Sequence, residues 1–449
     1  MRLVLLSLLL LVTAADLFSA SFSRDIAPIL VTECLACHSD EKAKGGYRVH
    51  TFAAVLSPGK SEQPPIVAGK PEESELFKRI ITHDELDRMP QDDEPLASAQ
   101  IELFRVWIAR GATLDRGDSE TALASLIPKA VHPAPPEYYR RAVPILALAF
   151  DPSGERLAVG GYHEISLWTP EGELLSRITN APQRIHAIAF QPAAENRFAI
   201  AGGKPGRAGE LSVYQDGNLL TNLLQTADEL LTVAFSADGK LLAGGGSDNT
   251  IHVFRTETWE RVTTIQQHAD WVTSVCFDSD GENILSASRD RTARIYNADS
   301  GELEITYPGH GAALSTAIFL SDNKAASAGK ENEIHIWDVK EGKKQNEIGG
   351  IEGEIFATIA AGEYFFTASA DKKVRQYETK SRNLFRTFSG HHDAVYSIAF
   401  HADTGRLAAG AYDGTVKIWS VQDGKLQSSF VAAPLKGTEQ ASLRSAAAE

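Results

Sequence analysis

Cysteine and histidine stand at a spacing that supports one particular chemistry in the run Cys34-Leu35-Ala36-Cys37-His38. Two thiols separated by two residues on a helical turn can bond to both vinyl groups of a haem, and the next residue can then present its imidazole to the iron. The run therefore predicts one covalently attached haem c. Cys34 and Cys37 are the predicted thioether residues, and His38 is the predicted proximal ligand of the iron.

Three other uses of this cysteine pair fit the sequence less well. A thioredoxin-like redox pair needs a βαβ surround, and no such pattern precedes the repeats described below. A structural zinc site needs four ligands, and only the distant Cys276 remains to supply sulfur. A simple disulfide leaves His38 without a role. Haem attachment accounts for all three residues.

The sixth ligand of such an iron is predicted to be Met89, the only methionine besides Met1. A thioether is a soft ligand that raises the potential of a haem iron relative to a second imidazole. Pro90 follows Met89 and keeps it out of a helix. His50 and His83 are alternative ligands, and an open sixth position is a third possibility. Met89 can also serve simply to fill an apolar gap.

Segments with helical periodicity surround these residues, at 23–33, 72–81 and 98–110. Their apolar residues recur three or four positions apart, as Ile26 and Leu30 do in the first segment. One helix before the cysteines and one near the end of this region are typical of a small all-α cytochrome of class I type. Apolar side chains around a haem tune its potential, as the axial ligand does.

The rest of the chain repeats with a period of 40 to 46 residues. Each unit contains short β-like runs separated by turns such as DPSGE and SADGK, and each third run ends in an aromatic residue. Four strands per unit at this period are the signature of a β-propeller blade. Seven aromatic residues predict seven blades: Trp168, Tyr214, Phe254, Tyr296, Trp337, Tyr377 and Trp419.

Histidine, serine and acidic residues recur in register with these aromatics, as His310, Ser327 and Glu331 do in the fifth unit. His268, Ser286 and Asp290 form the same set in the fourth. An enzyme needs one activated nucleophile and not several copies, so the repetition argues against a catalytic triad. Buried polar groups need partners, and a structural network is the better interpretation. Ala409 replaces the hydroxyl in the seventh unit.

The first residues predict export. Arg2 precedes an apolar run from Leu3 to Val12, and small residues suited to cleavage after Ala14 or Ala15 follow. The run is short for a membrane span, which needs about 20 residues. The sequence therefore predicts a periplasmic or otherwise exported protein with no membrane span after signal cleavage. A net charge of −15 disfavours nucleic acid and anionic lipid as partners.

Five regions are predicted along the chain: a signal peptide at 1–20, a c-type cytochrome domain at 21–115, a proline-rich linker at 116–142, a seven-bladed propeller at 143–433 and a disordered tail at 434–449. The fold class is therefore multi-domain. A small all-α unit precedes a larger all-β unit.

Two resemblances support this division. The runs FSRDIAPIL, CLACH, KAKGGYRVHT, IVAGKPEESELFKRI, RMP and VWIARGA resemble the planctomycete-type cytochrome c domain over residues 22–112. That resemblance implies His38 and Met89 as the axial ligands. The repeats resemble WD40 repeats through the pairs Gly309–His310 and Gly390–His391, and Trp337–Asp338 preserves the WD pair itself.

The sequence thus predicts an exported electron-transfer protein with a single haem c, whose propeller is a docking platform for a protein partner. The redox partner itself is not indicated, and an electron-transfer and protein-binding role is favoured over an enzymatic one. Two alternatives are a haem-linked oxidoreductase with its active site on the propeller and a structural or sensory scaffold. Gas sensing would need an open sixth position on the iron.

Overall fold

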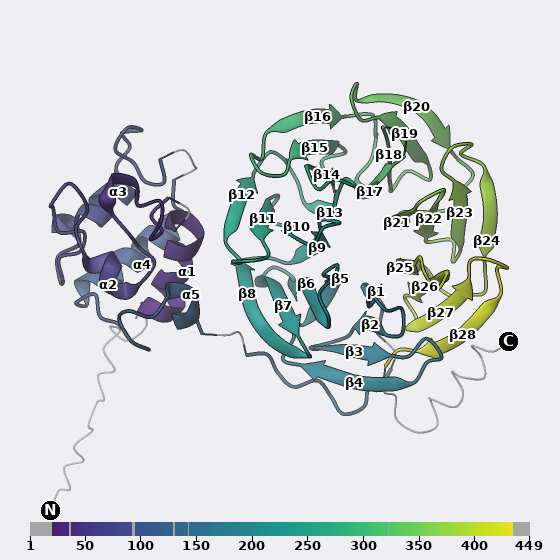
Figure 1. Ribbon diagram of the computed structural model, residues 1–449, viewed down its shortest axis with the longest axis horizontal. Helices are drawn as coiled ribbons and strands as arrows, with labels where there is room; N and C mark the ends of the chain where they lie inside the picture. The colour runs from purple at the N-terminus through teal and green to yellow at the C-terminus, as the bar shows by residue number, and fades with distance from the viewer. Residues whose placement is uncertain are drawn as a thin grey trace, which may run out of the picture. The chain divides into compact units, whose positions relative to one another are not determined.

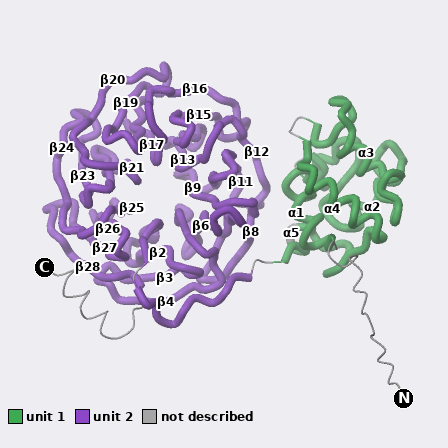
Figure 2. The backbone as a smooth tube through the Cα atoms, turned by 180° about the vertical axis from the view of Figure 1, so that it is seen from behind, with its two compact units in different colours: residues 1–129 green, residues 130–449 purple. Residues whose placement is uncertain are grey.

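The computed structural model describes residues 20–35, 37–91, 95–128, 131–141, 143–321 and 323–433. The predicted tail and all of the predicted signal peptide except Ala20 lie outside these residues. Figure 2 shows the division of the chain into two compact units, residues 1–129 and 130–449. No helix among the described residues is long and apolar enough to cross a membrane.

The second unit is a seven-bladed propeller, which confirms the prediction from the repeats. Each blade is a four-stranded antiparallel sheet of consecutive strands. The first strand of every blade lies nearest the centre and the fourth lies at the rim (Figure 1).

The strands of blades 1 to 4 are, in chain order, β1 (Leu148–Phe150), β2 (Leu157–Gly160), β3 (Glu164–Trp168), β4 (Leu174–Thr179); β5 (Arg184–Phe190), β6 (Arg197–Lys204), β7 (Ala208–Gln215), β8 (Asn218–Thr226); β9 (Leu230–Phe235), β10 (Leu241–Gly246), β11 (Ile251–Arg255), β12 (Arg261–Ile265); β13 (Val272–Phe277), β14 (Asn283–Ser288), β15 (Ala293–Asn297) and β16 (Leu303–Tyr307). Those of blades 5 to 7 are β17 (Leu314–Leu320), β18 (Lys324–Gly329), β19 (Ile334–Asp338), β20 (Lys343–Ile348); β21 (Ile355–Ala361), β22 (Tyr364–Ser369), β23 (Val374–Glu378), β24 (Leu384–Phe388); β25 (Val395–His401), β26 (Arg406–Ala411), β27 (Thr415–Ser420) and β28 (Leu426–Val431).

The second strand of each blade is buried along almost its whole length, because neighbouring blades cover both of its faces. Small residues dominate these strands, as in the run LLAGGG of β10. At Gly245 an added Cβ would lie 2.9 Å from a side-chain carbon of Val272 in the next blade. The close approach of adjacent blades therefore explains the alanine, glycine and serine of these strands.

The ring closes between its first and last blades. The backbone N–H of Ile145 donates to the carbonyl of Ala411, and the Ser397 hydroxyl donates to the carbonyl of Ile145 at 2.8 Å. β28 supplies the fourth strand of blade 7. Each blade therefore contains four strands without borrowing one from the segment that precedes β1.

Blades 4 and 5 hold the predicted polar networks. His268 bonds Asp290 through Nδ1 at 2.8 Å and Ser286 through Nε2 at 2.7 Å. In blade 5 His310 contacts Glu331 and Ser327 in the same way, at 2.8 Å each. Both histidines are buried, and every ring nitrogen has a partner. The repeated sets therefore satisfy buried polar groups, which is the structural interpretation of their recurrence.

Blades 6 and 7 each retain only part of this set. In blade 7 Ala409 stands at the register of Ser327, and both ring nitrogens of buried His391 lack a hydrogen-bond partner among the described residues. Burial lowers the pKa of His391 to about 3, so the ring stays neutral. In blade 6 the Thr367 hydroxyl is also unpartnered among the described residues.

The regular secondary structure of the first unit is helical in its described residues, apart from one isolated bridge between Thr51 and Ala122. Its elements are η2 (Phe22–Ile26), α1 (Ala27–Ile29), η3 (Leu30–Cys34), η4 (Lys44–Gly46), α2 (Phe52–Leu56), η5 (Pro71–Glu73), α3 (Glu75–Ile81), α4 (Ser98–Ala109) and α5 (Leu123–Leu126). The first three are consecutive and cover the helix predicted at 23–33. η5 with α3, and α4, cover the other two predicted helices.

The core of this unit is aromatic and aliphatic. Phe22 packs edge-on against Phe52 with ring centroids 4.7 Å apart, and both rings lie near Trp107 of α4. The Trp107 indole N–H donates to the carbonyl of Thr113 at 3.1 Å, so this large buried side chain has a partner for its polar atom. The helix before the cysteines is thereby packed against the last long helix of the unit.

The compact first unit extends beyond residue 115, into the region predicted as a linker. Leu123 and Leu126 of α5 are buried in its core, and the Leu123 N–H donates to the carbonyl of His50. Residues 131–141 belong instead to the second unit. There His132 contacts Glu210 at 3.0 Å and the Tyr139 hydroxyl donates to Glu164 at 2.6 Å. The predicted linker is therefore shared between the two units: its first part packs in the core of the first unit, and residues 131–141 bond to the second.

Ala409→Ser tests the incomplete network of blade 7. A hydroxyl at this register gives Nε2 of His391 the partner that Ser327 gives His310, and a net hydrogen bond is worth about 1 kcal/mol. We expect the free energy of unfolding to rise by about that amount in urea titrations of the full chain. Ala408→Ser is the matched control, because it buries a hydroxyl on the other face of the same strand. Equal destabilisation by both substitutions would contradict this role of residue 409.

Candidate functional site

A cavity of about 560 Å³ lies in the first unit, and all four residues predicted to hold a haem line it. Cys34, Cys37 and His38 come from the end of η3 and the turn after it, and Met89 comes from the loop after α3. His50 and His83, the alternative ligands, are not among the described residues that line it. The structure thus brings together residues that are up to 55 positions apart in the chain.

A helical turn orients the cysteines and the histidine. The N–H of Leu35 donates to the carbonyl of Leu30, and the N–H groups of Cys37 and His38 donate to the carbonyl of Cys34 at 3.2 and 3.0 Å. These hydrogen bonds close a turn between the end of η3 and His38. This local geometry places both thiols and the imidazole along one cavity wall.

Tyr47 fixes the imidazole of His38. The Nδ1–H of His38 donates to the backbone carbonyl of Tyr47 at 3.2 Å, which leaves the lone pair on Nε2. Burial lowers the pKa of His38, so the ring is neutral at neutral pH. The Tyr47 hydroxyl in turn donates to the carbonyl of Val55 at 2.8 Å, and its burial raises the pKa of the phenol. A neutral, oriented imidazole is the form that binds iron.

The backbone of α3 holds Met89 in place. The Met89 N–H donates to the carbonyl of Arg79 at 2.9 Å, so the loop folds back along the end of that helix. Arg79 itself forms an ion pair with Glu75 at 2.9 Å one turn earlier. Met89 is partly exposed, whereas His83 in the same loop is exposed. His50 lies near Asp40, with 3.9 Å between its Nε2 and a carboxylate oxygen.

The walls of the cavity are largely apolar. Val49, Leu76, Ile80 and Leu96 are buried and line it together with Pro65 and Pro90. Charged side chains also reach the lining: Glu33, Lys44, Lys60, Glu75 and Arg79. The volume lies within the range of about 300–1,000 Å³ that is typical of cofactor and ligand sites. Two thiols, one imidazole, one thioether and apolar walls fit a haem.

The sequence does not indicate that Tyr47 and Gly59 belong to this site. Tyr47 acts through its backbone carbonyl, which has no side-chain signature. Gly59 lies against the same residue, and an added Cβ there would be 2.9 Å from the Tyr47 nitrogen and 2.8 Å from the Gly45 oxygen. Gly45 and Gly46 before Tyr47 are the signal in the sequence that could have indicated this part of the site, because glycine allows close approach of two backbone segments.

The third cysteine of the chain is inert. Cys276 packs between blades 4 and 5, and its thiol donates to the carbonyl of Ala317 at 3.6 Å. Burial raises the pKa of this thiol to about 12. It offers neither a haem bond nor a reactive thiolate.

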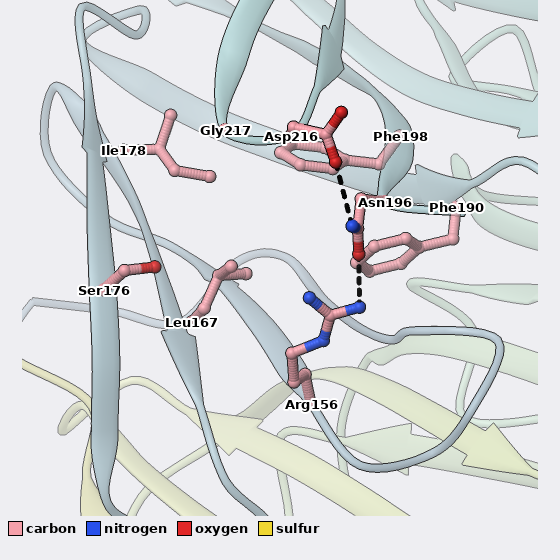
Figure 3. Close-up of a pocket in the computed structure, with 9 residues that line it drawn as sticks. All are labelled: Arg156, Leu167, Ser176, Ile178, Phe190, Asn196, Phe198, Asp216 and Gly217. Carbon is pink, nitrogen blue, oxygen red and sulfur yellow. Dashed lines mark hydrogen bonds between the residues drawn. The ribbon is translucent and has the colours of Figure 1, made fainter. Parts of the chain in front are cut away.

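A second cavity, of about 280 Å³, lies between blades 1 and 2 (Figure 3). The Arg156 guanidinium donates to Asn196, which donates to Asp216 at 2.9 Å. Arg156 also bonds Asp151 at 2.9 Å, so these polar groups satisfy one another. These hydrogen bonds link the two blades, and the polar groups bond to one another.

Comparison with known protein families gives a match in each of the two units. Residues 34–93 match the model described as Planctomycete cytochrome C, and residues 217–255, 259–297 and 382–420 match the model described as WD domain, G-beta repeat. The chain combines a planctomycete-type cytochrome c domain with a WD40-type propeller, as the sequence predicted. These matches indicate haem binding in the first unit and protein interaction in the second.

The curated relatives match the chain over short segments. The chain is 31% identical over 107 residues to the Target of rapamycin complex subunit wat1 of Schizosaccharomyces pombe, which is 23% of this chain and 34% of that protein. It is 31% identical over 90 residues to the Anaphase-promoting complex subunit cdc20 of Dictyostelium discoideum, 20% of this chain and 18% of that protein. It is 28% identical over 98 residues to the Guanine nucleotide-binding protein subunit beta of Arabidopsis thaliana, 20% of this chain and 26% of that protein. The chain spans about a third or less of each of these relatives.

Gly59→Ala tests the backbone support of His38. The added methyl group forces Gly59 away from Gly45 and Tyr47, and overpacking of this kind costs about 1–3 kcal/mol. We expect a lower free energy of unfolding and a lower ratio of haem to protein, measured on the full chain by calorimetry and absorbance. Gly349→Ala is the control, because a Cβ at Gly349 meets nothing within 4 Å. Unchanged stability and haem content in Gly59→Ala would contradict the argument.

Proposed function

We propose that the protein is an exported cytochrome that carries one covalently bound haem c and transfers electrons, with its propeller as a docking platform for a protein partner. The observation that carries this proposal is the convergence of Cys34, Cys37, His38 and Met89 on one apolar cavity. Haem binding is the use that accounts for all four of these residues. The helical first unit is, in this proposal, a class I-like cytochrome fold.

Each residue has a defined task in this function. Cys34 and Cys37 hold the haem through thioether bonds, His38 offers Nε2 to the iron, and Met89 offers its thioether as the sixth ligand. Haem c, when bound, supplies a one-electron couple between ferric and ferrous iron. Tyr47 keeps the His38 ring in one orientation, and the apolar walls exclude water from the ligands.

The position of the site suits exchange with a second protein. Cys34, Cys37 and Met89 are each only partly buried, so the cavity lies close to the surface of its unit. A partner can therefore approach without rearrangement of the core. A methionine ligand would fill the sixth position and favour electron transfer over gas binding.

The docking role rests on the propeller. A rigid ring of seven blades can vary its loops without loss of its core, so it presents a broad surface to a partner. Three of the relatives that this chain resembles in part are named as subunits. The net charge of −15 favours a partner with a basic surface.

One experiment tests both the export of the chain and the covalent attachment of its haem. When the full chain is expressed in a host that matures c-type cytochromes, we expect haem stain on the denatured polypeptide in the periplasmic fraction. Cys34→Ser with Cys37→Ser abolishes this stain, because no thioether remains. Cys276→Ser is the control and keeps it. Stain confined to the cytoplasmic fraction contradicts export, and loss of stain in the control contradicts the assignment of the two thiols.

Met89→Ala tests the sixth ligand. We expect loss of the weak long-wavelength band of methionine-ligated ferric haem and a lower midpoint potential in a redox titration, because a thioether raises the potential. Leu86→Ala is the control: this exposed residue lies in the same loop and is not among the described residues that line the cavity.

An unchanged spectrum and potential in Met89→Ala would refute the assignment. The same measurements on His50→Ala and His83→Ala then identify the alternative. A five-coordinate spectrum in the unsubstituted protein would favour the sensory function instead.

A further inference from the structure

Blade 5 differs from its neighbours at one repeated position. The residue two places before the blade aromatic is Arg294 in blade 4, Arg375 in blade 6 and Lys417 in blade 7. Arg294 and Arg375 form ion pairs with the acidic residue of their own blade, at 3.6 and 2.5 Å. In blade 5 this position is His335, and the acidic residue of that blade is already engaged.

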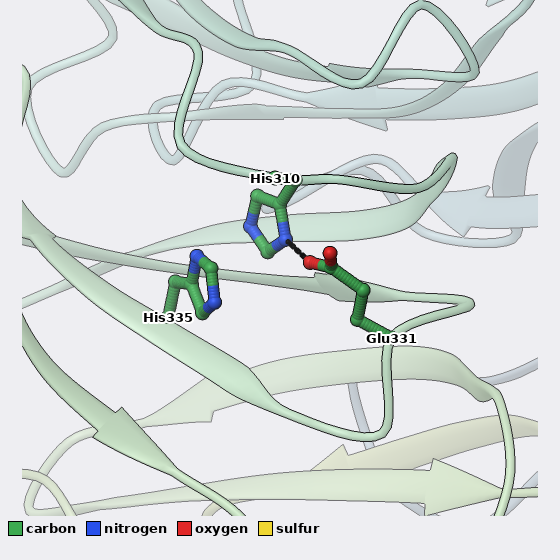
Figure 4. Close-up of side chains that lie close together, drawn as sticks. All are labelled: His310, Glu331 and His335. Carbon is green, nitrogen blue, oxygen red and sulfur yellow. Dashed lines mark hydrogen bonds and ion pairs between the residues drawn. The ribbon is translucent and has the colours of Figure 1, made fainter.

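The acidic residue Glu331 has no free oxygen for His335. Its Oε2 accepts from Nδ1 of His310 (Figure 4). Its Oε1 accepts from the N–H of Gly311 at 2.7 Å. Nε2 of His310 is bonded to Ser327. The three side chains His310, Glu331 and His335 are close enough to hold an ion together, but two of them are committed to the blade network.

His335 packs against His310 and Tyr307, and its Nε2 lies near two other carboxylates. Its ring stacks on His310 with centroids 3.9 Å apart, and its Nδ1 lies 2.9 Å from the Tyr307 hydroxyl. Only 3% of the residue is exposed. Its Nε2 has no hydrogen-bond partner among the described residues and points between two carboxylates. Oε2 of Glu333 is 3.7 Å away, and Oε2 of Glu347 is 3.8 Å away.

The strand register creates this arrangement. Glu347 of β20 is paired directly with His335 of β19, so their side chains emerge on the same face. Glu333 lies in the bend that leads into β19, two residues before His335. The three ligand atoms lie within 4.8 Å of one another. Glu333 and Glu347 are 44% and 42% exposed, so the site is accessible from solvent.

We propose that Nε2 of His335 and the carboxylates of Glu333 and Glu347 form a binding site for one divalent transition-metal ion of the zinc class. Separations of 3.7 and 3.8 Å are too long for hydrogen bonds, and they suit ligands that share an ion about 2.0–2.2 Å from each after a small contraction. Tyr307 accepts the Nδ1–H in the metal-bound state, which leaves Nε2 as the ligand atom.

One group competes for the site. Nζ of Lys344 lies 2.6 Å from Oε2 of Glu347, and the ammonium neutralises that carboxylate. Lys344 is exposed and flexible, so a divalent ion can displace it. The bound ion would join the exposed outer strand β20 to β19 and so fasten the rim of blade 5.

Calorimetric titration with ZnCl₂ tests the proposal on the full chain that carries Cys34→Ser and Cys37→Ser, so that these thiols contribute no binding. We expect one saturable site per chain. Glu333→Gln and Glu347→Gln should each weaken the affinity about tenfold or more, as loss of a ligand does. Both residues are exposed, so the fold is retained. Lys344→Met should tighten binding several-fold.

Glu341→Gln is the matched control. It removes the same charge from the turn of the same hairpin, where the Glu341 carboxylate forms an ion pair with Lys343 at 3.2 Å. We expect its affinity for Zn²⁺ to stay within about twofold of the parent. Zn²⁺ should also raise the midpoint of thermal unfolding in the parent and not in Glu347→Gln, because a ligand stabilises the state that binds it.

Three outcomes would overturn the site. One is the absence of saturable binding. Another is binding that survives both glutamine substitutions. The third is an equal loss in Glu341→Gln, which would mean that general surface charge attracts the ion. None of these outcomes bears on haem attachment in the first unit, so the proposed function is tested separately.

Discussion

The first unit depends on one helical turn, because the turn from Cys34 to His38 fixes which wall of the cavity can hold a haem. The residues of this turn are neighbours in the sequence, so the turn needs only the helix η3 that precedes it to be in place. The opposite wall has to be built from far along the chain. Helix α3 and the loop at Met89 provide it, with the Met89 N–H bonded to the carbonyl of Arg79 in α3. The aromatic packing of Phe22, Phe52 and Trp107 then holds the first and last helices around that space.

The second unit depends on a different constraint, which is that each blade must satisfy buried polar groups between tightly packed sheets. Blades 4 and 5 meet it with a complete set of histidine, hydroxyl and acid. Blades 6 and 7 leave Thr367 and His391 unpartnered among the described residues. A buried polar group without a partner costs about 1–3 kcal/mol. The ring tolerates these losses because every blade is also held by both neighbours.

Much of this architecture could be predicted from the sequence because its signals are periodic or adjacent. The seven aromatics identify seven blades, and the runs around Cys34, Cys37 and His38 indicate a planctomycete-type cytochrome c domain. The extent of that unit could not be predicted, because Leu123 and Leu126 form too short an apolar pattern to show that they are buried. The Tyr47 carbonyl that orients His38 has no sequence signature. The convergence of Glu333 and Glu347 on His335 depends on strand register, which the repeat pattern alone does not give.

Cys276 has a consequence for how such a chain matures. A thiol with a pKa of about 12 is ionised in only about one molecule in 10⁵ at pH 7, and the thiolate is the species that attacks disulfides and electrophiles. Once the propeller has formed, Cys276 is therefore withdrawn from thiol exchange, and Cys34 and Cys37 are the remaining pair. The folded propeller thus keeps this thiol out of any reaction that the other two cysteines undergo.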